Sequence, residues 1–128
     1  MIQLHNKYKS SVIASKKVNR ENVSRWGIFD FKKINKRDFL IKDVVEKPSI
    51  KSAPSSYAVI GRYILPAKIF KILMKQKPGK NGEIHITDAI RTLVRQKNKF
   101  IGHVFDGKYL DCGTMNGYIN SSIEISKL

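Results

Sequence analysis

A change of hydrophobic period at Pro66 constrains the fold of this chain more than any other feature of its sequence. Before Pro66, short runs of β-branched and aromatic residues alternate with turn residues, which is the pattern of β-strands. After Pro66, apolar residues recur at helical spacing in "PAKIFKILMKQK" and "ITDAIRTLVRQK". Because strand-like and helix-like segments interleave along 128 residues, we expect an α/β fold, either as one domain or as part of a larger one.

The segments predict individual elements. We expect helices at residues 1–8, 66–77, 86–97 and 114–128, and strands at residues 10–18, 23–31, 38–48 and 57–65. Residues 99–113 predict a hairpin-like pair of strands around "DGK". Gly27 is expected to break its strand, and Gly61 to mark a bulge or a close approach of the backbone. Thr87 is expected to cap the helix that it opens.

The positive charge of the chain first suggests a polyanionic partner. Lys and Arg number 25 against 10 Asp and Glu, a formal net charge of +15. The excess comes from 19 Lys and only 6 Arg, and the Lys are spread along the whole chain. Base readers and phosphate clamps rely on Arg forks, so nucleic acid is an unlikely partner, although a small basic nucleic-acid-binding module stays an alternative.

Cysteine and histidine usage argues against a metal centre. The single cysteine, Cys112, excludes an internal disulfide and a Cys-ligated zinc site, fits a reducing cytoplasm, and is expected to be buried packing. His5, His85 and His103 share no metal-ligand spacing and are interpreted as surface or strand residues. No apolar run approaches the roughly 20 residues of a membrane span, so we expect a cytoplasmic protein without a membrane partner.

An acid and a base stand side by side where a strand is expected to end. Glu46 and Lys47 directly precede Pro48, which cannot continue a central ladder. A carboxylate there can accept hydrogen bonds from sugar hydroxyls, and the ammonium can meet a phosphate as a point charge. Strand side chains alternate between faces, so the break at Pro48 helps both to reach one pocket. Taken alone, the two residues also fit a solvated surface pair.

Six segments, in order, carry a resemblance: "SSVIA", "VSRWGIFD", "VVEKP", "APSSYAVIGRYIL", "KPGKNGEIHITDAI" and "FDGKYLDCGTMNGY". Together they resemble the bacterial UTP–glucose-1-phosphate uridylyltransferases, a branch of the sugar-phosphate nucleotidyltransferases. The resemblance implies a Rossmann-like mixed sheet with flanking helices. It covers only the C-terminal, sugar-binding part, because the Gly-rich triphosphate loop and the main magnesium ligand of the family precede it. Residues 1–128 are therefore expected to be the C-terminal portion of the domain, with the N-terminal nucleotide-binding half absent and no catalytic residue assigned to this chain.

The resemblance also assigns site residues. It implies that Glu46 binds glucose hydroxyls, that Lys47 binds the sugar-linked phosphate, and that the backbone of Gly27 lies against the glucose ring. Val59 would line the same pocket, although a place in the core is its alternative. Asp111 in "LDCG" resembles an aspartate that helps to hold Mg²⁺, and its alternative is a cap on the last helix.

The implied reaction joins UTP and glucose 1-phosphate into UDP-glucose and pyrophosphate, with Mg²⁺ as cofactor and no covalent enzyme intermediate. Partners would be these substrates, a separately encoded N-terminal half and, as an option, further copies of the chain. Three interpretations stay open: a truncated or split-gene piece that works with such a half, a non-catalytic remnant, and the basic binding module. For the remnant, we expect an open apolar sheet edge where the other half is lost.

Overall fold

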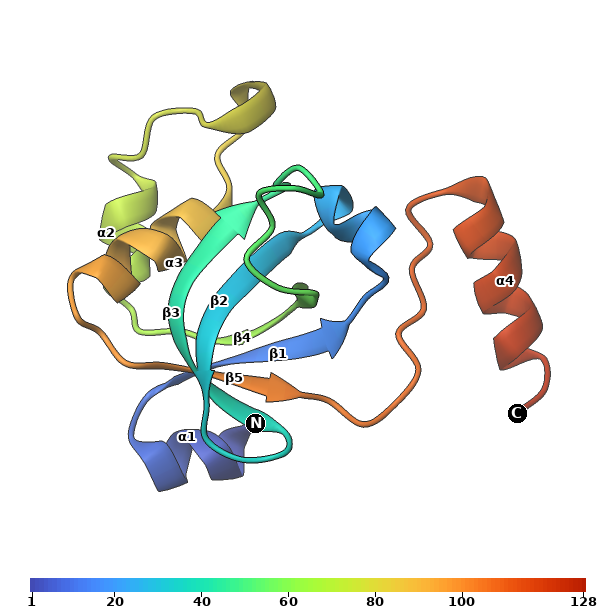
Figure 1. The fold of residues 1–128 in the computed structure, drawn as a ribbon, viewed down its shortest axis with the longest axis horizontal. Coiled ribbons are helices and arrows are strands. Elements are labelled where there is room, and N and C mark those ends of the chain that lie inside the picture. The colour runs from blue at the N-terminus through green and yellow to red at the C-terminus, as the bar shows by residue number, and fades with distance from the viewer.

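The computed structural model describes the backbone of residues 1–128 and all side chains except that of Lys80. The elements, in chain order, are α1 (Ile2–Tyr8), β1 (Ser11–Lys17), η1 (Arg20–Arg25), β2 (Gly27–Lys33), β3 (Asp38–Glu46), β4 (Tyr57–Ile64), α2 (Ile69–Leu73), η2 (Lys80–Gly82), α3 (Ile86–Arg95), β5 (Phe100–Val104) and α4 (Met115–Ile125). Strands and helices interleave as expected (Figure 1), which confirms the α/β class.

The strands form one mixed sheet that closes on itself in the order β1-β4-β2-β3-β5. β5 runs parallel to β1 and antiparallel to β3, which closes the ring. The narrowest junction joins β2 to β4 at Ile28 and Ala58. The predicted open sheet edge is therefore wrong for the part of the chain that the structure describes, because every strand there has a partner on both sides.

The main core lies between this sheet and α3. α3 buries Ala89, Ile90 and Leu93 completely, and these residues join a cluster with Phe29 and Phe100 from the strands. The apolar residues of α3 recur at helical spacing, so one stripe of the helix meets the sheet. This packing fixes the first turn of α3 against the strands that end beside it.

Two predicted elements differ from the observed ones after Pro66. The helix expected over residues 66–77 is only Ile69–Leu73, and Phe70, one of the apolar residues of that pattern, is 66% exposed. The second strand of the expected hairpin over residues 99–113 is wrong, since β5 is followed by irregular chain up to α4. A pattern of apolar residues alone cannot distinguish an extended segment from a paired strand.

The segment expected as one strand over residues 23–31 begins instead as the short helix η1. Val23, a residue of η1, is fully buried, and the strand starts only at Gly27. The prediction for Gly61 is confirmed: its φ is 70°, and the register of β4 against β1 shifts beside it. A left-handed backbone of this kind costs little only for glycine.

α4 lies apart from the sheet (Figure 1), beyond an extended connection from β5. The hydroxyl of Thr114 accepts a 3.1 Å hydrogen bond from the backbone N–H of Gly117 and so caps the helix. The helix expected over residues 114–128 is confirmed. Its first turns leave Met115 73% and Tyr118 58% exposed. No helix among those described is both long and apolar enough to cross a membrane.

Candidate substrate-binding site

The end of β3 meets the first turn of α3 at one carboxylate. Glu46, the last residue of β3, accepts a 2.6 Å hydrogen bond on Oε2 from the hydroxyl of Thr87. The Glu46 side chain is 13% exposed and Thr87 is 5% exposed. A carboxylate this deep requires donors, because burial removes the water that would otherwise solvate it. The prediction that Thr87 caps α3 is therefore wrong. Its hydroxyl donates its hydrogen bond to Glu46 instead.

Gly27 lies opposite Glu46 in the β2–β3 ladder. A Cβ at Gly27 would stand 2.7 Å from Cγ2 of Thr87, 3.1 Å from Oε2 of Glu46 and 3.3 Å from Cγ2 of Val59. The first of these distances is too short for any side chain. Gly27 therefore marks a close approach of the backbone to the side chains of Thr87 and Glu46. It forms no bulge, because the β2 register shifts only later, between Asp30 and Phe31.

A small cavity of about 190 Å³ opens beside this carboxylate. Its lining comes from η1, the ends of β2 and β3, the middle of β4 and the start of α3: Arg25, Trp26, Gly27, Glu46, Val59, Tyr63, His85, Ile86 and Thr87. The structure thus brings Glu46, Gly27 and Val59 together, as the sequence predicted. Val59 is 6% exposed and also packs in the main core, as its alternative interpretation predicted.

Lys47 lies next to this cavity without lining it. Its φ of 43° is left-handed, and its backbone N–H donates a 2.9 Å hydrogen bond to the carbonyl of Trp26. This conformation, rare for a residue with a Cβ, ends the regular alternation of β3. The Lys47 ammonium lies 4.0 Å from a carboxylate oxygen of Glu83.

His85 contributes to the site and was not foreseen as a site residue. Its Nδ1 lies 3.8 Å from Oε1 of Glu46, and its Nε2 lies 3.6 Å from Oε2 of Glu83. The His85 side chain is only 12% exposed. The imidazole therefore stands between two carboxylates in the lining of the cavity, whereas the sequence was interpreted as placing His85 on the surface or in a strand. The sequence signal that could have indicated this role is the position of His85, two residues before Thr87.

Tyr63 is a second lining residue that sequence reasoning missed. Burial raises the pKa of the Tyr63 hydroxyl, and the negative charge of Glu46 raises it further, with a smaller contribution from Tyr109. Both residues line the same cavity, so the charge of the Glu46 carboxylate acts on the phenol. Its hydroxyl is accordingly a neutral donor at neutral pH, in the same cavity as the carboxylate.

Asp111 does not join this cavity. It lines another one, of about 400 Å³, and its Oδ2 lies 3.2 Å from Nη2 of Arg25, which also lines the Glu46 cavity. Asp111 does not cap α4 either, since Thr114 does so. Its other oxygen accepts a hydrogen bond from the N–H of Gly113. Cys112, predicted to be buried, is exposed beside it.

Within the described residues, the implied magnesium site offers fewer than three His, Cys, Asp or Glu side chains. No group of three or more His, Cys, Asp or Glu side chains gathers anywhere in the described part of the chain. Mg²⁺ prefers at least one free carboxylate together with phosphate oxygens and water. Asp111 is the single predicted ligand, and a guanidinium already neutralises it.

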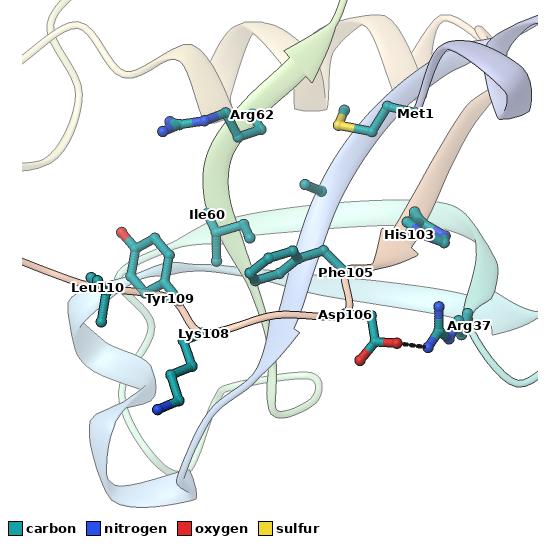
Figure 2. A pocket seen from close by; sticks show the side chains of 11 residues that line it. Met1, Arg37, Ile60, Arg62, His103, Phe105, Asp106, Lys108, Tyr109 and Leu110 are labelled. Atoms are coloured by element: carbon teal, nitrogen blue, oxygen red, sulfur yellow. Dashed lines mark hydrogen bonds and ion pairs between the residues drawn. The ribbon is translucent and has the colours of Figure 1, made fainter. Parts of the chain in front are cut away.

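A larger cavity, of about 600 Å³, lies elsewhere (Figure 2) and shares no lining residue with the Glu46 cavity. Its wall includes His103, whose Nδ1 lies 2.7 Å from Oδ1 of the buried Asp38. Burial raises the pKa of the Asp38 carboxyl, but hydrogen bonds from Asn35 and His103 outweigh this and hold it below its usual value. Arg37 and Asp106 form an ion pair at the rim.

The chain is thus an α/β protein with one mixed sheet, and a buried carboxylate lies at a strand end beside a glycine. A family model described as nucleotidyl transferase matches residues 1–127, and the chain therefore belongs to the nucleotidyl transferase family. The match begins at the first residue of the chain. The match confirms the family. The placement of the chain in the C-terminal part of the family domain stays a prediction.

The chain is similar to known uridylyltransferases over nearly all its length. It is 38% identical to a putative UTP–glucose-1-phosphate uridylyltransferase of Methanocaldococcus jannaschii over 98% of the chain, and 38% identical to the UTP–glucose-1-phosphate uridylyltransferase of Pseudomonas aeruginosa over 95%. The chain covers only 44% and 43% of these two relatives. It therefore spans less than half of their length.

Solved structures agree with this likeness. A UDP-glucose pyrophosphorylase complexed with UDP-glucose superposes with a TM-score of 0.92 at 46% identity, covering 98% of this chain and 47% of that one. A UDP-glucose pyrophosphorylase from Acinetobacter baumannii superposes with a TM-score of 0.80 at 31% identity, covering 97% of this chain and 42% of the other. The fold is thus that of a nucleotidyl transferase, with a mixed sheet and flanking helices.

Proposed function

We propose that this chain supplies the sugar-phosphate side of a UTP–glucose-1-phosphate uridylyltransferase site. The observation that carries the proposal is the Glu46 carboxylate, held by Thr87 beside the bare backbone of Gly27 in a cavity of about 190 Å³. The names of the relatives support the substrate class. A buried carboxylate with acceptor capacity left over is suited to neutral polyols, which offer several hydroxyl donors.

The roles of the residues follow from this placement. Glu46 accepts hydrogen bonds from glucose hydroxyls, Gly27 lets the ring approach the backbone, and Val59 forms an apolar wall. Lys47 meets the sugar-linked phosphate once its ammonium turns from Glu83 to the more highly charged anion. The distance of 4.0 Å between Lys47 and Glu83 describes a loose ion pair, which costs little to exchange.

The donor side of the site would come from outside this chain. We propose that residues 1–128 correspond to the C-terminal portion of the family domain, because the "VEKP", "TDA" and "DCG" segments follow in that order and the 128 residues contain no Gly-rich phosphate loop. The chain also spans less than half of its relatives. UTP would then bind to the nucleotide-binding part of the family domain, which these 128 residues do not supply. A cytoplasmic location stays a prediction.

In the assembled enzyme, an oxygen of the glucose 1-phosphate would attack the α-phosphorus of UTP. One P–O bond forms, the bond from the α-phosphorus to the bridging oxygen breaks, and pyrophosphate leaves with that oxygen. This chain contributes the binding and alignment of the attacking phosphate, a main source of catalysis when no covalent intermediate exists. The magnesium prediction for Asp111 would require ligands from the partner and release of Asp111 by Arg25, so no step is assigned to it.

The proposal is tested by complementation. The chain is co-expressed with the missing part of a UDP-glucose pyrophosphorylase relative, and pyrophosphate release from UTP and glucose 1-phosphate is measured. Activity should appear with the parent chain and be lost in Glu46→Ala and Lys47→Ala. Lys42→Ala, at an exposed position of β3, serves as the matched control and should stay active. A co-purifying but inactive complex, or an active Glu46→Ala complex, would contradict the proposal.

A further inference from the structure

We propose that Thr87 is a positioning residue: its hydroxyl fixes the rotamer of Glu46 so that the carboxylate faces the sugar. The inference rests on the proposed function, because it takes Glu46 as the residue that meets the glucose hydroxyls. The sequence around Thr87 predicted a helix cap and gave no indication that its hydroxyl orients Glu46. The role depends on a contact between two residues that are 41 positions apart in the chain.

The geometry around Thr87 holds both partners in place. Its hydroxyl reaches Oε2 of Glu46 at 2.6 Å, and its methyl carbon lies beside Gly27, 2.7 Å from where a Cβ of that residue would stand. With Thr87 only 5% exposed, its side chain has little freedom to rotate away. A β-branched side chain held by packing on Cγ2 has a fixed Oγ1, so the donor is preorganised before any ligand arrives.

The bond from Thr87 divides the carboxylate into two functional ends. Oε2 is engaged with Thr87, whereas Oε1 lies on the side of His85, at 3.8 Å from Nδ1. A carboxylate offers about four lone-pair sites, so the bond from Thr87 leaves acceptor capacity for a polyol. Glu46 is at the end of a strand and next to the left-handed Lys47, where the backbone alone restrains it less than within the ladder.

Thr87 also owes its position to packing that is independent of any ligand. The next turn of α3 buries Ala89, Ile90 and Leu93 in the core, and this holds the start of the helix against β3. The carboxylate near the first turn of a helix of ten residues gains from the positive end of the helix dipole. The folded chain thus presents the carboxylate with its orientation already set.

The test compares Thr87→Val, which keeps the shape and removes the donor, with Thr87→Ser, which keeps the donor and removes the methyl group. Thr92→Val, at an exposed site on the same helix, is the matched control. The probes are glucose 1-phosphate and inorganic phosphate, titrated into the full 128-residue chain and followed by NMR chemical shifts. The ratio of the two Kd values isolates the contribution of the sugar.

A hydrogen bond to a charged group corresponds to roughly ten- to a hundredfold in an equilibrium constant. Thr87→Val should therefore weaken glucose 1-phosphate binding about tenfold or more and leave phosphate binding unchanged, while Thr87→Ser stays closer to the parent and Thr92→Val equals it. In a Glu46→Ala background, Thr87→Val should have no further effect on the sugar contribution. A general structural role would instead weaken both probes in both backgrounds.

The outcomes separate this inference from the proposed function. If the parent prefers glucose 1-phosphate to phosphate but Thr87→Val keeps the full preference, the positioning role is wrong and the site stands. If the parent shows no preference, the proposed function fails. In that case, urea unfolding of Thr87→Val, Glu46→Ala and the double variant tests whether the two side chains interact. Additive changes in the free energy of unfolding would contradict the contact between Thr87 and Glu46, and non-additive changes would support it.

Discussion

Arg91 on α3 holds Asp43 on β3 through two parallel hydrogen bonds, with Nε 2.9 Å from Oδ1 and Nη2 2.9 Å from Oδ2. Such a bidentate pair fixes the distance and also the angle between two groups. Asp43 lies on the same strand as Glu46, and Arg91 lies one turn of α3 beyond Thr87. The pair therefore sets the position of the helix whose first turn holds the site carboxylate.

Replacement of Arg91 by Ala should lower the free energy of unfolding by about 1–3 kcal/mol, because Asp43 is three-quarters buried and would lose its charged partner. Urea denaturation measures this change. Arg95→Ala is the control: its guanidinium lies 3.5 Å from Asp43 and is 62% exposed, so its loss should cost less than about 1 kcal/mol. Equal costs for the two variants would show that the bidentate geometry has no special role.

Acid should destabilise the fold through Asp38 and Asp43. Burial raises the pKa of each carboxyl, but the hydrogen bond from Asn35 on Asp38, and that from Arg91 on Asp43, help to hold both pKa values below the usual range. The unfolded chain then binds more protons, so this stability is present above the ordinary aspartate pKa of about 4 and is lost as the pH falls toward the lower folded values.

Measurement of the free energy of unfolding from pH 6 downward in Asp38→Asn should give a shallower decline than in the parent, because one such group no longer titrates. Asp106→Asn, at a side chain that is 78% exposed, should keep the parent slope. If Asp38→Asn loses stability with falling pH as steeply as the parent, Asp38 is not a source of the acid sensitivity.

The phenol of Tyr63 should report on the charge of Glu46. Burial is the first cause of its raised pKa and the Glu46 carboxylate the second, so Glu46→Gln should lower the pKa of Tyr63 but leave it above the ordinary value of about 10. The ¹³Cζ resonance of Tyr63 followed through alkaline pH gives the measurement. Lys42→Gln, which changes charge on the same strand at an exposed site, should have little effect. If the pKa of Tyr63 is the same in Glu46→Gln as in the parent, the two groups are not close in solution.

Gly27→Ala should destabilise the chain by about 1–3 kcal/mol and weaken glucose 1-phosphate binding, because the new methyl group would stand 2.7 Å from Cγ2 of Thr87. The double variant Gly27→Ala/Thr87→Ser removes that Cγ2 and should recover part of the lost stability, as measured by thermal unfolding. If the second substitution adds its own cost instead of relieving the first, the crowding at this contact is not the cause.

Local pattern predicted the end of β3, because the alternation stops before Pro48. The nearness of Gly27 and Val59 to Glu46 was implied by the family resemblance and not by the pattern of their own segments. Contacts across long stretches of chain were beyond it: Thr87 has the sequence context of a helix cap, and only the packing of α3 shows that its hydroxyl bonds Glu46 instead.

Other differences have similar origins. Asp111 lies 86 positions from Arg25, so their ion pair could not be read from either segment. The left-handed backbone of Lys47 follows from its hydrogen bond to Trp26 on a neighbouring segment rather than from its own residue type. The closure of the sheet depends on β5, whose five residues pair with β1 and three of which also pair with β3. A short apolar run does not identify these partners in advance.

The most direct test of the proposed sugar-binding site is a titration of the isotope-labelled chain with glucose 1-phosphate, with Glu46→Ala titrated in parallel. Saturable shifts should appear at the amides of Gly27, Val59 and Thr87 in the parent and be lost in Glu46→Ala, while inorganic phosphate alone should bind more weakly to the parent. The absence of saturable shifts at these amides, or equal binding by Glu46→Ala, would contradict the assignment of this cavity to the sugar.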